Sequence, residues 1–182
     1  RDADGVEVRT DDDRAHRFDA AVIATHAPQA LAMLADADDE ERAVLGAFRT
    51  TRNVTVLHTD PALLPRRAAA RASWNYLVAD CRSPSALPTV TYYLNKLQRI
   101  DAREHYCVTL NREHGIAPER VLRRLEYAHP LYTFEALDAQ ERLPSLGGRR
   151  RTWFCGAYHG FGFHEDGLAS GLRAAAALGA PW

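Results

Sequence analysis

The chain has 182 residues, of which 46% are hydrophobic and 26% are charged. This composition is ordinary for a soluble globular protein, and the length allows one sizeable core or two small ones. The formal net charge of −1 gives no indication of nucleic acid or an anionic membrane as a partner, and no segment reaches the ~20 apolar residues of a transmembrane helix.

The cysteines and the first residues indicate the cellular compartment of the protein. Cys81, Cys107 and Cys155 are far apart and follow no disulfide or metal-ligand spacing, which favours a reducing cytoplasm. The chain begins at Arg1 with a polar turn, without an initiator Met or a signal peptide. We therefore expect a fragment of a longer cytoplasmic protein.

Two strand patterns open the chain. Residues Gly5–Arg9 alternate polar and apolar side chains before a polar turn at 10–14, which predicts one arm of a hairpin with an exposed face. Residues Phe18–Thr25 form a nearly continuous apolar run, which predicts a fully buried strand of a parallel sheet.

Two helices are expected next. Pro28 stands where a first helical turn begins, and the pattern continues to Leu34. The acid-rich segment 36–41 then favours the start of a second helix that continues to Phe48, because negative charge stabilises a helix N-terminus.

The sequence of the middle of the chain predicts the strands of a mostly antiparallel sheet. Turn residues separate these strands, including a turn at Ser83–Ser85. Helices are predicted at Pro118–Arg124 and Phe134–Leu143, followed by a basic turn at Gly147–Arg151. The four predicted strands are Asn53–Thr59, Ala72–Val78, Thr89–Leu94 and Tyr106–Asn111.

Buried-strand patterns at both ends therefore bracket an antiparallel middle, which is the order produced by an insertion into a nucleotide-binding fold. We predict that residues 1–35 and 147–182 belong to one domain and that 36–146 form the inserted domain.

The most informative segment is C-terminal. A strand at Arg151–Cys155 ends at Gly156, and a glycine-punctuated loop leads to a helix for which Asp166 is the predicted N-cap. Glycine permits close backbone approach to a ligand, and the N–H groups of a first helical turn favour an electron-rich group. A simple strand–loop–helix closing a domain is the alternative. The loop glycines are Gly160, Gly162 and Gly167.

This segment resembles the C-terminal signature of bacterial FAD-dependent oxidoreductases of the flavin-containing amine oxidase type, often described as predicted NAD/FAD-binding proteins. Other segments resemble that family in the same order along the chain. The matching segments are 18–25, 73–76, 91–98, 129–130 and 153–172.

The resemblance implies an α/β fold with an α+β middle: part of a glutathione-reductase-like FAD domain with an inserted, mostly antiparallel substrate domain. FAD is the implied cofactor. The residues implied to contact FAD are Gly156, Ala157, Phe163, His164, Glu165, Asp166, Gly167 and Ser170.

Two departures from the family pattern limit what this chain does alone. Ala157 stands where many relatives carry an acid, and no GxGxxG unit for the FAD phosphates occurs in the sequence. We therefore expect this polypeptide by itself to bind FAD poorly and to be inactive, with its parent supplying the missing unit.

The implied activity is hydride transfer to flavin from an amine or from a C–H bond of a modified fatty acyl chain, so that peripheral membrane contact is conceivable. Relatives often need no acid or base besides the flavin, so no catalytic side chain is assigned. An aromatic pocket wall and ordinary core packing are alternative roles for a second group of residues. This group is Trp74, Tyr76, Tyr92, Tyr158 and His159.

Other chemistries fit the sequence less well. His159, His164, Glu165 and Asp166 lack the HExxH spacing of a zinc site, and Cys155 near His159 is better explained as a buried small side chain than as a nucleophile. No serine lies in a nucleophile elbow. The second hypothesis is a truncated, non-catalytic relative that binds a lipid or a protein.

Overall fold

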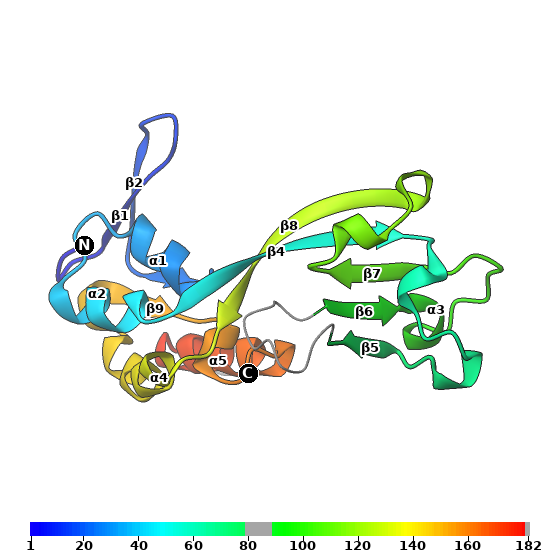
Figure 1. Ribbon diagram of the computed structural model, residues 1–182. Coiled ribbons are helices and arrows are strands. Elements are labelled where there is room, and N and C mark those ends of the chain that lie inside the picture. The colour runs from blue at the N-terminus through cyan, green and yellow to red at the C-terminus, as the bar shows by residue number, and fades with distance from the viewer. Residues whose placement is uncertain (79–88, 181–182) are drawn as a thin grey trace. The chain divides into compact units, whose positions relative to one another are not determined.

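The computed structural model describes residues 1–78 and 89–180 (Figure 1), so the predicted turn at Ser83–Ser85 lies outside the described residues. The chain divides into two compact units. Unit 1 comprises Arg1–Thr50 and Pro130–Trp182, and unit 2 comprises Thr51–His129.

Unit 1 contains two small sheets, both expected from the sequence. Strands β1 (Val6–Arg9) and β2 (Ala15–Phe18) form an antiparallel hairpin with an exposed face. Strand β3 (Ala21–Ile23) pairs in parallel with β9 (Thr152–Phe154), which joins segments from opposite ends of the sequence. The prediction of a parallel strand in this region is therefore confirmed.

The predicted length and burial of that strand are wrong. Phe18 belongs to β2 and is exposed, and β3 has only three residues. Side chains alternate between the two faces of a strand. Ile23 consequently packs on the core, whereas the Val22 side chain is exposed. The apolar run thus covers a hairpin end and a short strand that is buried on one face.

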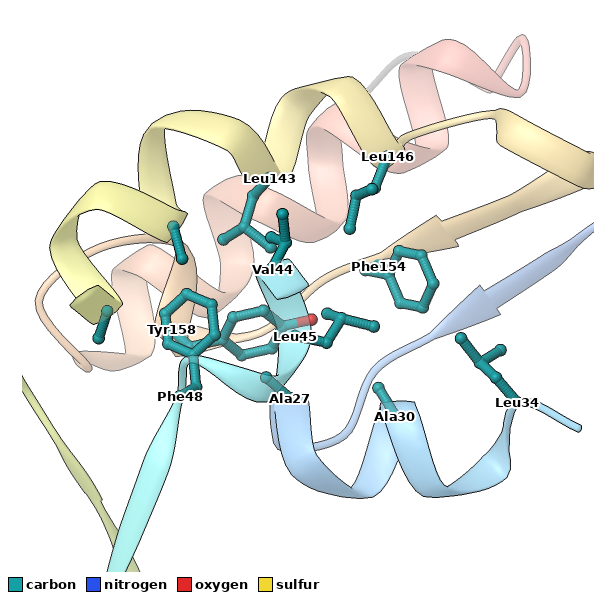
Figure 2. Close-up of a cluster of buried hydrophobic side chains, with 12 residues drawn as sticks. Ala27, Ala30, Leu34, Val44, Leu45, Phe48, Leu143, Leu146, Phe154 and Tyr158 are labelled. Carbon is teal, nitrogen blue, oxygen red and sulfur yellow. The ribbon is translucent and has the colours of Figure 1, made fainter. Parts of the chain in front are cut away.

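The core of unit 1 is built by helices around β9. Leu45 of α2, Leu143 and Leu146 of α4, and Phe154 of β9 are almost fully buried in one cluster (Figure 2). The sequence predicted a helix in each of these four places, and α4 continues past its predicted end at Leu143. The helices of unit 1 are α1 (Ala27–Met33), α2 (Asp39–Gly46), α4 (Phe134–Leu146) and α5 (His164–Ala177).

A buried ion pair fixes the start of the chain to α2. The Arg1 guanidinium donates hydrogen bonds to both carboxylate oxygens of Glu41 at 2.8 Å, and its Nε donates to Asp36. Glu41 also accepts a bond from the backbone N–H of Asp38, whose side chain caps α2. The Arg1 and Glu41 side chains are both almost completely buried, so water cannot take the place of either partner in these hydrogen bonds.

Unit 2 is built on a five-stranded sheet in the order β5-β6-β7-β4-β8. The four predicted strands are present, and the pairs β5–β6, β6–β7 and β4–β7 are antiparallel as expected. Helix α3 (Leu94–Leu97) follows β6 directly. The strands are β4 (Arg49–His58), β5 (Trp74–Leu77), β6 (Thr89–Tyr93), β7 (Cys107–Leu110) and β8 (Val121–Leu131).

The helix predicted at Pro118–Arg124 is wrong. Only one 3-10 turn forms, at Pro118–Arg120, and the chain then enters the long strand β8. Proline favours the first turn of either kind of helix, so it gave no information about the length. Pairing with β4 at the edge of the sheet supplies the hydrogen bonds that decide the conformation of Val121–Leu131.

The boundaries of the units also differ from the predicted division at residues 36 and 146. Segments 36–50 and 130–146, expected in the inserted domain, belong to unit 1. The physical reason is the apolar face of each helix: α2 and α4 bury Val44, Leu45, Leu143 and Leu146 in the unit 1 core.

One face of the unit 2 sheet buries a polar chain. His58 Nε2 lies 2.8 Å from Thr109 Oγ1, which lies 2.9 Å from Thr91 Oγ1, and all three side chains are almost inaccessible. The Asp60 backbone N–H donates to His58 Nδ1. Because Nδ1 accepts, the neutral His58 ring carries its proton on Nε2 and donates it to Thr109.

We predict that replacing Glu41 by Gln destabilises the protein by about 3 kcal/mol, since the buried Arg1 guanidinium then keeps only the more exposed Asp36 carboxylate as a charged partner. Chemical denaturation of the full chain measures this loss. Arg142→Gln is the control, because the Arg142–Glu40 pair is exposed and such pairs contribute at most about 1 kcal/mol. Equal losses in the two variants would contradict the prediction.

We also predict an acid-dependent loss of stability from His58. Burial lowers the pKa of His58 below its ordinary value, although nearby Asp60 opposes the shift. The unfolded chain therefore binds the proton more readily, and the contribution of His58 is complete above about pH 6.5 and is lost as the pH falls toward the folded pKa.

The measurement is the free energy of unfolding against pH for the wild type, His58→Gln and His114→Gln. His114 is exposed, so its variant should keep the wild-type slope while His58→Gln has a shallower one. Identical slopes in all three proteins would show that His58 does not contribute.

Candidate functional site

The C-terminal loop leaves β9 through a glycine that no other residue replaces easily. Gly156 has a φ of 156°, and a Cβ placed on it would lie 2.7 Å from the Tyr158 ring. The chain then makes a 3-10 turn at Ala157–His159 before the loop reaches α5. Gly156 is thus required by the packing of Tyr158, a reason that the sequence analysis did not identify.

Ser170 connects this bend to α5. Its Oγ accepts a hydrogen bond from the Gly156 backbone N–H at 2.9 Å and lies 2.7 Å from the Gly167 carbonyl oxygen. The side chain is buried. Both the donor and the acceptor capacity of the Ser170 hydroxyl are therefore used inside the protein, and its role here is to fix the end of β9 against the first turns of α5.

Asp166 is not the N-cap of α5, and this prediction is wrong. The helix begins at His164, so Asp166 lies in the first turn and Gly167 lies in the helix. The Asp166 carboxylate reaches back and accepts from the backbone N–H groups of Phe161 and Phe163 at 3.0 and 2.9 Å. Asp166 therefore orders the loop from within the first turn of α5. The helix consequently begins at His164 and not after residue 166.

Gln140 of α4 is a further determinant of the loop that the sequence did not reveal. Its side-chain amide donates to the carbonyl oxygens of Tyr158 at 3.0 Å and Gly160 at 2.7 Å. A polar residue in an amphipathic helix usually faces solvent, so no sequence signal distinguished it. Gln140 and Asp166 together satisfy carbonyl and N–H groups on successive parts of one loop.

Tyr158 lies in the unit 1 core rather than on an open surface. It is 4% exposed, and its ring meets the Phe48 ring edge-on at 5.2 Å within the cluster of Figure 2. Its hydroxyl has no hydrogen-bond partner among the described residues. Of the two roles considered for Tyr158, core packing is the one that the structure shows.

Two neighbouring groups are uncharged near neutral pH. Burial raises the pKa of the Cys155 thiol, which is unfavourable for a nucleophilic thiolate. Burial and the positive charge of Arg173 lower the pKa of His159 to about 4. Cys155 therefore behaves as a small apolar side chain, as the sequence analysis favoured.

The surface at the start of α5 combines aromatic rings with free backbone donors. Phe161 and Phe163 are 79% and 65% exposed, and the first-turn N–H groups of a helix have no partner within it. His164 and Glu165 are exposed beside them. Of the residues implied to contact FAD, those at 163–165 remain accessible, whereas Asp166 and Ser170 are engaged by the backbone.

The aromatic residues expected in a pocket wall of the inserted domain share one face of the unit 2 sheet. Trp74 pairs directly with Tyr92, and their rings meet at 5.5 Å. Trp74 and Tyr76 are 63% and 65% exposed, so core packing is wrong for these two residues. Val90, Val108 and Leu110 continue the same face, which carries no charge on β5, β6 or β7.

Within residues 1–78 and 89–180 no group of three or more His, Cys, Asp or Glu side chains is arranged to hold a metal ion. No helix there has the length and apolar character needed to cross a membrane.

Comparisons with solved structures identify the fold. The chain superposes on a putative protoporphyrinogen oxidase from Exiguobacterium sp. 255-15 with a TM-score of 0.61 and 15% identity, covering 98% of this chain and 44% of that one. It superposes on the fatty acid isomerase of P. acnes that produces CLA with a TM-score of 0.65 and 16% identity, covering 96% and 45%. No family model and no curated sequence matches.

The chain thus has the mixed α/β fold of part of these two proteins and spans less than half of their length.

A test of the position of Tyr158 follows from its unpaired hydroxyl. The free energy of unfolding of Tyr158→Phe should equal that of the wild type or exceed it by up to ~1–3 kcal/mol, because an unsatisfied buried hydroxyl is removed. Tyr158→Ala should lose ~3–5 kcal/mol through the cavity it leaves. Denaturation curves measure both, with the exposed Tyr127→Phe as a neutral control. A clear loss in Tyr158→Phe would reveal a partner for the hydroxyl.

Proposed function

We propose that this chain is the C-terminal part of an FAD-dependent oxidoreductase, in which unit 1 contributes to the flavin site and unit 2 to the substrate-binding part. The observation that carries the proposal is the ordered loop before α5, which lies in the segment that resembles the flavin amine oxidase signature. The shared fold with an oxidase and an isomerase supports an enzyme as the parent.

The residues at this surface fit one portion of the cofactor. A flavin ring has apolar faces and an edge that becomes electron-rich on reduction. Exposed Phe161 and Phe163 offer apolar contact, and the positive end of the α5 dipole favours electron density nearby. No glycine-rich phosphate loop is present in the sequence, so the fit concerns the ring and not the diphosphate.

When bound, a flavin supplies hydride acceptance from a C–H or C–N bond, and the protein contributes binding, orientation and electrostatics. The role proposed for this chain is therefore positional. Asp166 and Gln140 hold the loop, and Ser170 fixes its origin. In this proposal the α5 N-terminus would lie toward the flavin ring. The apolar sheet face at Trp74, Tyr76 and Tyr92 is the proposed contact for an amine or acyl substrate.

The decisive experiment compares visible absorption spectra of the full-length gene product and of this 182-residue chain mixed with FAD. We expect a bound flavin spectrum in the full-length protein and none in the chain alone. A well-folded full-length protein that neither contains nor binds flavin would refute the proposal and favour a lipid- or protein-binding module.

A paired substitution in the full-length protein tests the loop. Asp166→Ala removes both acceptor bonds to Phe161 and Phe163, so flavin occupancy after purification should fall. Asp138→Ala, on α4, is the matched control, because Asp138 forms no ion pair among the described residues and is exposed. Equal flavin content in the wild type and both variants would show that the loop does not contact the cofactor.

A further inference from the structure

The neutral overall charge conceals a strong separation between the two units. Residues 51–129 contain twelve Lys and Arg against seven Asp and Glu, whereas the rest of the chain contains eleven against seventeen. Unit 2 is therefore cationic, and unit 1 is anionic. A molecule that interacts with unit 2 would be selected for negative charge.

Within unit 2 the described residues form a depression with a volume of about 340 Å³, which is the size range of small-ligand sites. Its walls are largely apolar and come from two separate segments: Leu63, Leu64 and Pro65 on one side, and Tyr76 and Leu77 of β5 on the other. The depression can accept an apolar chain of a ligand.

Two arginines complete the lining, at positions 66 and 112. The side chains of Arg66 and Arg112 form no hydrogen bond or ion pair with any described residue, unlike those of Arg52 and Arg124, which pair with acids in the same unit. Guanidinium groups that lack an internal carboxylate and border an apolar depression are suited to bind an anionic oxygen-containing head group.

The position of Arg112 depends on a missing side chain. A Cβ on Gly115 would lie 3.3 Å from both Arg112 Nε and Leu63 Cδ2. These distances are shorter than ordinary van der Waals contacts of a Cβ atom. The absence of a Cβ at Gly115 therefore leaves room for the Arg112 side chain beside Leu63. The Arg112 side chain is exposed and borders this apolar wall.

The wall itself is fixed before any ligand arrives. Asp60 accepts hydrogen bonds from the backbone N–H groups of Ala62 and Ala117, both at 2.9 Å. Arg71 Nε donates to the Pro65 carbonyl oxygen, and Lys96 Nζ donates to the Arg71 carbonyl oxygen. A pre-formed wall reduces the ordering cost of binding.

From these observations we propose that unit 2 binds a single-chain amphiphile with a carboxylate head, whose apolar chain lies against Leu63 and Tyr76 and whose head pairs with Arg66 and Arg112. This inference rests on the proposed function, because Tyr76 also belongs to the sheet face proposed to contact the substrate. Its test requires no flavin, so a failure to bind the amphiphile is distinguishable from a failure of the flavin proposal.

The test is isothermal titration of the full chain with monomeric dodecanoate near neutral pH. We expect saturable binding of one ligand. Arg66→Gln and Arg112→Gln should each weaken it by about ten-fold or more, the effect of losing a charge-assisted hydrogen bond. Gly115→Ala should also weaken it by displacing Arg112. Arg103→Gln removes the same charge from an exposed position outside the depression and should leave the affinity unchanged.

Three further arms keep the proposal falsifiable. Butyrate has the head without the long chain, and dodecyltrimethylammonium has the chain with the opposite charge; neither should bind comparably. Vesicles of phosphatidylglycerol detect general attraction to anionic membranes. Equal weakening by Arg103→Gln, equal binding of the cationic amphiphile, or binding to vesicles without binding of free dodecanoate would overturn the proposal. Circular dichroism of each variant verifies that it is folded.

Discussion

The apolar packing of Leu45, Leu146 and Phe154 is the contact on which the rest of unit 1 depends. These residues come from α2, α4 and β9, and they hold together two stretches of chain that flank the whole of unit 2. Burial of side chains of this size contributes about 1.5–3 kcal/mol each. The end of β9, and with it the loop that follows, has a defined position because Phe154 is fixed in this core.

The loop shows how polar groups refine what the core positions. Its carbonyl groups are used by Gln140, its N–H groups by Asp166, and the bend at Gly156 by Ser170. Gln140 comes from α4, which is anchored in the core, whereas Asp166 and Ser170 come from α5. Gln140 and Ser170 bond part-buried backbone groups, which are costly when unpaired, and Asp166 adds two bonds at exposed positions. Together the three side chains favour a single loop conformation, with the Phe161 and Phe163 rings outside.

Patterns of local periodicity predicted most elements, because strand alternation, helix starts and turn residues are written within a few neighbouring positions. The same reasoning failed at Val121–Leu131, where pairing with β4 overrides the local signal, and at Phe18–Thr25, where an apolar run was divided between a hairpin and a short strand. The participation of Gln140 and the burial of Tyr158 depend on tertiary contacts that no local pattern contains.

The parallel pairing of β3 with β9 has a kinetic consequence. Ala21 lies opposite Thr152, so this pairing joins residues that are far apart in the sequence. The entropy lost in closing a loop grows with the length of the loop. Contacts of such large sequence separation slow folding. Formation of the unit 2 sheet before this pairing would shorten the loop that has to close and would thereby accelerate the assembly of unit 1.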